Sequence, residues 1–503
     1  MKIYPEFSAF NKRYTEDRQA GLMWTRLIAD LETPVSAYLK LADGQAYSCL
    51  FESVEGGANI GRYSIIAMRP DLIWRAVDLK PEINRNPQLD SNTFETDDRP
   101  ALESLRALMA ESRIDPEPSL PPMTAGGLFG YLGYDMVRLV EKIPNGNPDE
   151  LGLADAVLMR PTVIAVFDNI DRTITFATPV RPTDGMDAEA AYAAGAERLT
   201  TALQNLRRST PVTPQLPEGE IPTGEPVSNM TPEDYMGAVE AAKEYIRAGD
   251  VFQIVPSQRF SRPFPLPPFA LYRALRRLNP SPFLFFVNFD GFSIVGSSPE
   301  ILVRVRDGKV TIRPLAGTRP RGATAKEDQA LAEDLLADPK ELAEHLMLLD
   351  LGRNDVGRVA EIGSVEVTER FVIERYSHVM HIVSNVEGKL SADHDPFDAL
   401  MAGFPAGTVS GAPKVRAMEI IDEIEVAKRG IYAGCVGYFG ADGSMDNCIA
   451  LRTAVVKDGI MYVQAGAGVV ADSDPAKEHE ETINKAKALF RAADEALSIA
   501  GAS

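Results

Sequence analysis

Apolar and polar residues alternate along several short stretches of the first 208 residues, which predicts β-strands there. In longer stretches, apolar residues recur every three or four positions, which predicts helices. Residues 79–100 are polar and predict a loop, whereas residues 126–135 combine glycines with aromatic residues and predict a strand that leads into a turn. The predicted strands are 35–39, 46–51, 63–67, 157–168 and 172–178, and the predicted helices are 101–112 and 187–207.

The pattern changes after residue 228, where helices and more strongly apolar strands follow one another in clusters. Residues 301–306 alternate strictly, as expected for a sheet with one buried face. Because strands and helices do not alternate regularly, a layered α+β sandwich is favoured over a doubly wound fold. The predicted helices are 231–248 and 268–278, with two more that begin at Asp338-Pro339 and Asp474-Pro475, and the predicted strands are 251–260, 283–289, 292–297 and 301–306.

A proline-rich stretch separates the two halves. Residues 209–228 contain five prolines and few large apolar residues, which is typical of a linker. A chain of 503 residues is also long for one hydrophobic core. We therefore expect an N-terminal domain over 1–208 and a C-terminal domain over 229–503.

The charge balance narrows the classes of partner. The 52 Lys and Arg residues against 72 Asp and Glu residues give a net charge of −20, which disfavours nucleic acid and anionic membranes as partners. Three cysteines without a CxxC pair indicate a reducing compartment. No signal peptide is evident, and no apolar run approaches the ~20 residues that a membrane helix needs. We expect a cytoplasmic protein that must meet an anionic substrate with local cations or a metal.

Two helices carry the same arrangement of carboxylates. Each begins with Asp-Pro and then presents a Glu-x-x-Glu pair, Glu341 with Glu344 and Glu478 with Glu481. The two members of a pair share one face, and Lys485 lies on the face of Glu481. Carboxylate oxygens are the ligands that Mg²⁺ prefers, so the pairs are candidates for a magnesium site beside an anionic substrate.

Surface chemistry offers another interpretation of each pair. Glu341 is placed to complete a capping box with Asp338, and the other glutamates are placed for solvated salt bridges along their helices. The residues around the pairs favour a site, because the apolar strand 464–470 that precedes the second helix contains two glycines. Glycine inside a strand often marks the close approach of a ligand.

Taken together, these residues resemble the chorismate-utilising enzymes, which include anthranilate, aminodeoxychorismate, isochorismate and salicylate synthases. The resemblance implies an α/β/β/α sandwich with large antiparallel sheets flanked by helices, in which both domains take part. The matching segments follow one another in the order expected for this family. They are residues 249–260, 296–300, 313–321, 341–355, 378–388, 404–414, 450–452 and 464–485.

The resemblance assigns roles to residues of these segments. Glu344 and Glu481 would bind Mg²⁺ directly, with Glu341 and Glu478 in support. Glu300 would be the general acid at the C4 hydroxyl, which requires burial to raise its pKa. His381 would take part in pyruvate elimination, with Thr408 as a third catalytic residue. Those implied to bind chorismate are Gln253, Gly317, Thr318, Tyr432, Arg452, Gly466, Gly468 and Lys485.

Arg452 is the implied ligand of the pyruvyl carboxylate. Taken alone, an arginine on the strand after Cys448 is more often a surface charge on an edge strand. Only its place in the matching segment favours the binding role.

Two positions indicate which reaction of the family the chain performs. Isochorismate and salicylate synthases use a lysine to activate water, and the matching position here is Gln253, which cannot deprotonate water. Many aminodeoxychorismate synthases use a lysine nucleophile where this chain has Ala316. Both differences favour addition of ammonia at C2 and release of pyruvate, which gives anthranilate. The alternatives left open are an aminodeoxychorismate synthase, a catalytically silent sensor and a Mg²⁺-dependent phosphoryl-transfer enzyme.

The resemblance also implies partners. No cysteine lies in a Gly-x-Cys-x-Gly nucleophile elbow, so no glutaminase is expected in this chain. The resemblance implies that a separate glutamine amidotransferase subunit supplies ammonia, in a heterotetramer. The N-terminal domain is expected to bind this partner and to regulate the enzyme. A pocket for the feedback inhibitor tryptophan is implied for Glu52, Ser53, Pro282, Phe283 and Leu284.

Overall fold

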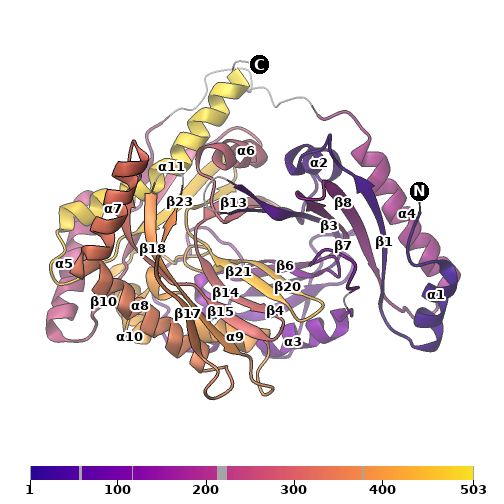
Figure 1. Ribbon diagram of the computed structural model, residues 1–503, viewed down its shortest axis with the longest axis horizontal. Coiled ribbons are helices and arrows are strands. Elements are labelled where there is room, and N and C mark those ends of the chain that lie inside the picture. The colour runs from indigo at the N-terminus through magenta and orange to yellow at the C-terminus, as the bar shows by residue number, and fades with distance from the viewer. Residues whose placement is uncertain (1, 56–58, 116, 212–223, 377–378, 502–503) are drawn as a thin grey trace.

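The computed structural model describes residues 2–55, 59–115, 117–211, 224–376 and 379–501. Helices lie around the outside and strands fill the centre (Figure 1). The α-helices are α1 (Phe7–Asn11), α2 (Pro34–Leu41), α3 (Ala101–Ser112), α4 (Ala188–Leu206), α5 (Pro232–Ala248), α6 (Pro268–Leu278), α7 (Ala325–Ala337), α8 (Pro339–Gly357), α9 (Pro396–Gly403), α10 (Lys414–Ile424) and α11 (Pro475–Gly501).

The described strands of the large sheet pair antiparallel, and the sheet folds into two layers. Its strands are β1 (Gly21–Ile28), β2 (Ser48–Glu55), β3 (Asn59–Val77), β4 (Lys80–Asn84), β5 (Glu95–Thr96), β6 (Gly127–Leu132), β7 (Ala156–Asp168), β8 (Thr173–Val180), β9 (Val227–Ser228), β11 (Ser257–Pro263), β12 (Phe283–Asn288), β13 (Phe292–Ser298), β14 (Ile301–Arg306), β15 (Lys309–Ile312), β16 (Leu315–Pro320), β17 (Glu366–Arg375), β18 (Val379–Lys389), β20 (Cys435–Gly440), β21 (Met445–Ile449), β22 (Thr453–Lys457) and β23 (Ile460–Gly466). A separate ribbon joins β10 (Gln253–Ile254) to β19 (Gly411–Ala412).

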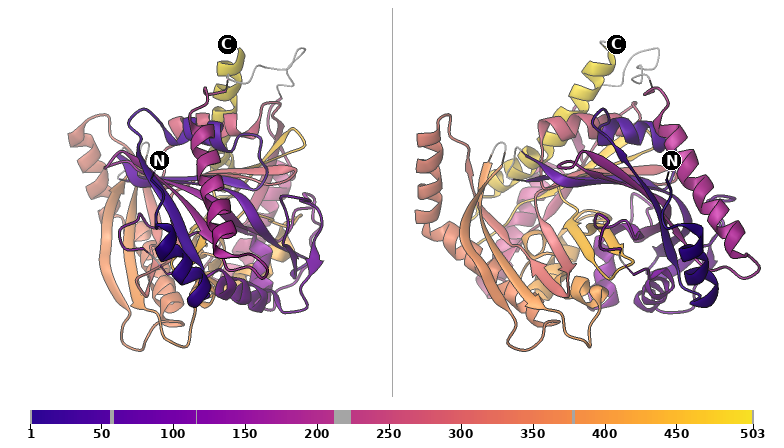
Figure 2. Two further views of the ribbon diagram at one scale, coloured as in Figure 1. Left: turned by 90° about the vertical axis from the view of Figure 1, so that its right-hand side faces the viewer. Right: turned by 45° about the vertical axis from the view of Figure 1, so that its right-hand side comes forward.

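The long strands β3 and β7 belong to both layers. The first half of β3 pairs with β2, and its second half pairs with β4. Its register with β7 shifts between Pro70 and Leu72, at the change of layer. The side chains of β3 show the same change of layer. Ile65 packs between the two layers, and its neighbour Ile66 packs against the helices on one outer face. Trp74, in the second half of β3, packs against the helices on the other outer face. This arrangement is the expected α/β/β/α sandwich (Figure 2).

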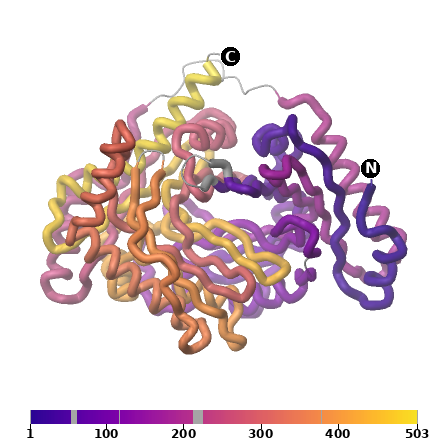
Figure 3. The backbone as a smooth tube through the Cα atoms, in the orientation of Figure 1, coloured from indigo at the N-terminus to yellow at the C-terminus, as the bar shows by residue number. Residues whose placement is uncertain are grey.

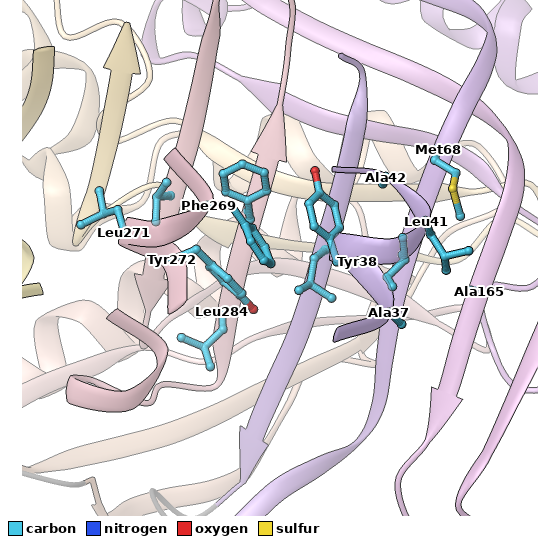
Figure 4. Close-up of a cluster of buried hydrophobic side chains, with 14 of the residues drawn as sticks. Ala37, Tyr38, Leu41, Ala42, Met68, Ala165, Phe269, Leu271, Tyr272 and Leu284 are labelled. Atoms are coloured by element: carbon cyan, nitrogen blue, oxygen red, sulfur yellow. The ribbon is translucent and has the colours of Figure 1, made fainter. Parts of the chain in front are cut away.

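Helices cover the two outer faces of the sandwich. Side chains of α2, α4, α6 and α11 form one outer core, and side chains of α3, α8, α9 and α10 form the other. In the first of these cores, the rings of Tyr38 from α2 and Phe269 from α6 stack with their centroids 4.5 Å apart (Figure 4). Burial of such aromatic pairs contributes strongly to the energy of a core.

Strands from the two halves of the chain lie side by side (Figure 3). Strand β2 pairs with β12, and β6 pairs with β20. The sandwich is therefore assembled from residues on both sides of the predicted linker. Residues 212–223 of that linker lie outside the described residues, and its last two residues form β9, which pairs with β11.

Several predicted elements need correction. Residues 35–39 form helix α2, not a strand, because Thr33 caps the helix, Pro34 occupies its first turn and Ser36 completes a capping box. The predicted loop 79–100 contains β4 and β5, and the predicted strand 251–260 is divided into β10 and β11. Strand β1 was not predicted. No helix within the described residues is long and apolar enough to cross a membrane.

Candidate active site

A cavity of about 390 Å³ brings together all fifteen residues predicted for catalysis, chorismate and Mg²⁺. It lies among α8, α11, β10, β16, β18 and the turns before β14 and β22. These elements are far apart in sequence, so the cavity exists only in the folded sandwich. The predicted residues that line it are Gln253, Glu300, Gly317, Thr318, Glu341, Glu344, His381, Thr408, Tyr432, Arg452, Gly466, Gly468, Glu478, Glu481 and Lys485.

The four glutamates lie in the first two turns of α8 and α11. Burial raises the pKa of Glu344, and the negative charges of Glu341 and Glu481 raise it further. Burial also raises the pKa of Glu478, with a further contribution from Glu481. The two pairs therefore repel each other across the cavity, although they belong to helices more than a hundred residues apart.

Two of the glutamates already have a cationic partner. Arg319 donates to the carboxylate of Glu341 at 3.2 Å, and Lys485 forms an ion pair with Glu481 at 2.8 Å. Because its carboxylate is bound to Arg319, Glu341 does not complete a capping box with Asp338. Lys485 also donates to the carbonyl oxygen of Gly466 at 2.9 Å. Within the described ranges, Glu344 has no ion pair.

The carboxylate oxygens of the four glutamates are suitable ligands for a hard divalent cation. Among the described residues no three His, Cys, Asp or Glu side chains are already gathered closely enough to hold a metal. Mg²⁺ usually takes only one or two protein carboxylates, together with waters and an anionic substrate. The mutual repulsion of Glu344 and Glu481 is the electrostatic environment that such a cation would relieve.

Glu300 is buried at the start of β14, where it is 6% exposed. Burial raises the pKa of its carboxyl group to about 8, so this group carries a proton at neutral pH. Thr408 donates its hydroxyl to the carboxyl group, with 3.2 Å to each oxygen. The nearby positive charge of Arg452 opposes the rise in pKa.

Arg452 lies in a turn between β21 and β22, with a left-handed backbone conformation at φ +47°. Its guanidinium faces the cavity, and burial lowers its pKa. The side chain makes no hydrogen bond or ion pair that would occupy it within the part of the chain that the structure describes. The alternative of a surface charge on an edge strand is therefore wrong.

His381 is held from one side of its ring. Its Nδ1 lies 3.1 Å from the carbonyl oxygen of Gly317 and 3.0 Å from the hydroxyl of Thr318. Burial lowers the pKa of the imidazole to about 4, so the ring is neutral at neutral pH. A proton on Nδ1 satisfies the carbonyl of Gly317 and leaves Nε2, which is buried and has no partner among the described residues, as an acceptor.

Two glycines of the cavity permit close approach of other side chains. Gly317 has φ +79°, and a Cβ there would lie 3.1 Å from Oε2 of Glu341. A Cβ at Gly468 would lie 2.8 Å from Nε2 of Gln253. A larger residue at either position would therefore displace a glutamate or glutamine of the cavity.

Two features of the site were not predicted. Gln464 lines the cavity, although no role was assigned to it. Beneath the cavity, the buried pair Glu425–Arg429 has a shortest N–O distance of 2.6 Å, and Arg429 also donates to the carbonyl oxygens of Val255 and Val409. An i, i+4 spacing of charges is ordinary on helix surfaces, so the sequence carried no signal that this pair is buried.

A second, larger cavity of about 720 Å³ contains the residues predicted to bind tryptophan. Strands β2 and β12 place Glu52 opposite Leu284. The carboxylate of Glu52 is already paired, because Tyr272 donates to it at 2.6 Å and Arg276 at 2.6 and 2.9 Å. The predicted residues that line this cavity are Glu52, Ser53, Pro282, Phe283 and Leu284.

The two cavities are neighbours. Pro299 and Leu315 line both of them. Tyr376 lines the larger cavity, and its ring meets the edge of His381 with the centroids 5.4 Å apart. Tyr376 therefore lies between the larger cavity and His381.

Comparisons with known proteins agree with this geometry. The family described as chorismate binding enzyme matches residues 70–491. Anthranilate synthase component 1 of Cereibacter sphaeroides is 60% identical over 479 residues, which are 95% of each chain. The protein of the same name from Pseudomonas aeruginosa is 51% identical, over 92% of this chain and 94% of its own length.

Solved structures give the same result. The crystal structure of anthranilate synthase component I from Streptococcus pneumoniae has a TM-score of 0.74 and 38% identity, over 93% of this chain and 99% of its own. A menaquinone-specific isochorismate synthase from Escherichia coli, at 21% identity and a TM-score of 0.70 over 97% and 99% of the two chains, shares the fold. The chain therefore belongs to the chorismate-binding enzymes and, among them, to the anthranilate synthase component 1 family.

Proposed function

We propose that the 390 Å³ cavity converts chorismate and ammonia to anthranilate and pyruvate. The observation that carries this proposal is the buried carboxyl group of Glu300, with its raised pKa, in one cavity with two pairs of carboxylates and with the guanidinium of Arg452, which has no ion pair among the described residues. An acid, a cation and a place for a divalent metal are what elimination from a dianion requires.

Chorismate would be held at both of its carboxylates. Arg452 binds the pyruvyl carboxylate, since its guanidinium is buried and free of protein partners among the described residues. Glu344 and Glu481 would hold Mg²⁺, with Glu341 and Glu478 supporting them. When bound, Mg²⁺ supplies positive charge that offsets the ring carboxylate. The remaining contacts to the substrate come from Gln253, Gly317, Thr318, Tyr432, Gly466, Gly468 and Lys485.

The first step is an addition with loss of water. The nitrogen lone pair of ammonia forms a bond to C2, both ring double bonds shift by one position, and the C4–oxygen bond breaks. Glu300 gives its proton to the leaving hydroxyl, and the proton lost by the new ammonium group goes to solvent. Thr408 keeps the carboxyl group of Glu300 in place through its hydroxyl.

The second step removes pyruvate and makes the ring aromatic. A base takes the C2 proton, the C–H electron pair completes the aromatic ring, and the bond from C3 to the enolpyruvyl oxygen breaks. The released enol then becomes pyruvate. His381 supports this step, because its ring is neutral and its Nε2, which has no partner among the described residues, can accept the proton.

The partners form a further part of the proposal. A separate glutamine amidotransferase subunit supplies ammonia, in a heterotetramer in the cytoplasm, and residues 1–208 contribute to its binding and to regulation. Tryptophan occupies the 720 Å³ cavity, where the apolar wall of Pro282, Phe283 and Leu284 supports an aromatic ligand.

Aminodeoxychorismate synthesis is the main alternative. Ala316 is buried in β16 and offers no nucleophile, which favours anthranilate. Purified protein with chorismate, Mg²⁺ and an ammonium salt separates the two by their products. Equal amounts of anthranilate and pyruvate, lost on addition of EDTA, are expected, whereas accumulation of aminodeoxychorismate would contradict the proposal.

A further inference from the structure

Arg319 does not line the 390 Å³ cavity, but its guanidinium holds one of the four glutamates that do. Its Nη1 donates to Oε1 of Glu341 at 3.2 Å. Its other two nitrogens donate to Asp334 and Asp338, each at 2.8 Å. Asp338 in turn caps α8, because its other carboxylate oxygen accepts from the backbone N–H groups of Lys340 and Glu341. Three carboxylates therefore fix the guanidinium against the start of α8.

The second carboxylate oxygen of Glu341 lies close to the backbone of β16. Gly317 on that strand has φ +79°, and a Cβ on it would lie 3.1 Å from Oε2 of Glu341. The register of β16 with β18 shifts between Ala316 and Thr318, as at a β-bulge, and bulges are frequent beside active sites. Residues of β16 therefore meet both oxygens of Glu341, Arg319 at one and Gly317 at the other.

Two of the other glutamates are held less firmly. Glu344 has no ion pair within the described ranges. Glu481 pairs with Lys485 at 2.8 Å, but these two side chains are 48% and 43% exposed, and exposed pairs of this kind are weak. The side chain of Arg319 is only 21% exposed and has three carboxylate partners. Glu341 is therefore held in place more firmly than Glu344 or Glu481.

The fixed cation changes what α8 offers to a divalent metal. Mg²⁺ usually takes one or two protein carboxylates and leaves its other positions to water and substrate. A glutamate bound to a guanidinium has one oxygen occupied and its charge offset, so it is a poorer ligand than a free glutamate. With Glu341 bound to Arg319, Glu344 is the glutamate of α8 that remains available to the metal.

We propose that Arg319 is a positioning residue of the metal site, which keeps Glu341 from binding the metal directly and so reserves a coordination position for the substrate. This inference rests on the proposed function, and it adds a residue that lies outside the cavity. It predicts an unusual result, because loss of Arg319 should strengthen metal binding. If Arg319 only supported α8, its loss would loosen the helix and weaken metal binding instead.

The test uses variants of the full chain. Arg319→Met removes the positive charge, and Arg319→Lys retains one as the conservative variant. Arg321→Met is the matched control, because Arg321 donates to Asp328 at 2.6 Å and contacts no glutamate of the cavity among the described residues. Glu341→Gln, alone and combined with Arg319→Met, shows whether Arg319 acts through Glu341.

Metal binding is measured with Mn²⁺, which takes the same oxygen ligands as Mg²⁺ and can be followed by electron paramagnetic resonance. Chorismate is present and ammonium is absent, so the substrate is not aminated. Arg319→Met is expected to lower the Kd for Mn²⁺ about tenfold, since a nearby positive charge is removed and a carboxylate is freed. Arg319→Lys should remain close to the wild type, and Arg321→Met should leave the Kd unchanged.

The reaction itself gives a second measurement. In the ammonium-dependent assay at saturating Mg²⁺, Arg319→Met is expected to raise the KM for chorismate about tenfold, because the freed carboxylate of Glu341 competes with the substrate for the metal. Metal binding and substrate binding should thus change in opposite directions, whereas a loosened α8 would weaken both.

The outcome in the Glu341→Gln background decides whether Glu341 is the intermediary. The gain in Mn²⁺ affinity should largely disappear there. An unchanged or higher Kd in Arg319→Met would overturn the inference. An equal gain with and without the carboxylate of Glu341 would also overturn it, because Arg319 would then act by its charge alone. If the wild type binds no Mn²⁺ in the presence of chorismate, the metal site of the proposed function is itself wrong, and the role of Arg319 falls with it.

Discussion

The hydroxyl of Thr408 lies 3.2 Å from both carboxyl oxygens of Glu300. This contact joins the turn before α10 to the start of β14 and helps to hold the buried acid in place. Opposing effects act on the pKa of this acid. Burial raises the pKa of Glu300 to about 8, and the hydrogen bond from Thr408 lowers it.

The raised pKa of Glu300 sets the pH dependence of the reaction. Below about pH 8 the carboxyl group is protonated and can serve as the acid, and above it the proton is lost. The kcat, measured at constant free ammonia, is therefore expected to fall as the pH rises through about 8. Glu300→Gln should lower kcat by about 10²- to 10⁴-fold, the usual contribution of a general acid. A kcat that does not change across this range would exclude Glu300 as the acid.

Removal of the Thr408 hydroxyl should shift that pH profile. Because the hydrogen bond favours the charged carboxylate, Thr408→Val is expected to raise the pKa of Glu300 further. The decline in kcat should then move to higher pH by up to about one unit. Thr408→Ser keeps the hydroxyl and serves as the control. A shift to lower pH in Thr408→Val would contradict the assigned hydrogen bond.

Mg²⁺ binding should depend on Glu344 and Glu481. Glu344→Gln or Glu481→Gln is expected to raise the Mg²⁺ concentration for half-maximal activity by about 10- to 100-fold or more. Without Mg²⁺, Glu344→Gln should raise the melting temperature, because it removes a buried charge that Glu341 and Glu481 repel. The control is Glu480→Gln, on an exposed position of the same helix turn. Equal Mg²⁺ requirements in all of these proteins would rule out the carboxylate site.

Tryptophan inhibition should be lost when the larger cavity is filled. Ser53 lines this cavity and does not line the smaller one, so Ser53→Phe occupies the space for an aromatic ligand. We expect inhibition by tryptophan to weaken about tenfold or more, the loss of roughly 1.4 kcal/mol of binding, with the KM for chorismate unchanged. Tryptophan that still inhibits Ser53→Phe with wild-type strength would place its site elsewhere.

Helices with clear ends were predictable from the sequence, because capping residues and periodicity act locally. Helices α3 and α6 have the predicted bounds 101–112 and 268–278. Helix α2 was missed because Val35 and Tyr38 favour strands, and the capping box of Thr33 and Ser36 overrides that preference.

The site was predictable as a set of residues through the family resemblance, but its electrostatics were not. The burial of Arg452 depends on a left-handed turn between two strands, which the sequence does not mark. The orientation of Gln464 depends on Ser257 and Glu425, each from a different segment. Such relations arise only when distant strands pair, so they have no local pattern.

The fate of the ammonia nitrogen tests the central claim most directly. Purified protein is incubated with chorismate, Mg²⁺ and isotopically labelled ammonium, and the products are analysed by mass spectrometry and nuclear magnetic resonance. The account predicts label in anthranilate, on the ring carbon next to the one that bears the carboxylate, with one pyruvate released for each labelled molecule. Label at C4 in a product that keeps its pyruvyl group, or no turnover of chorismate, would contradict it.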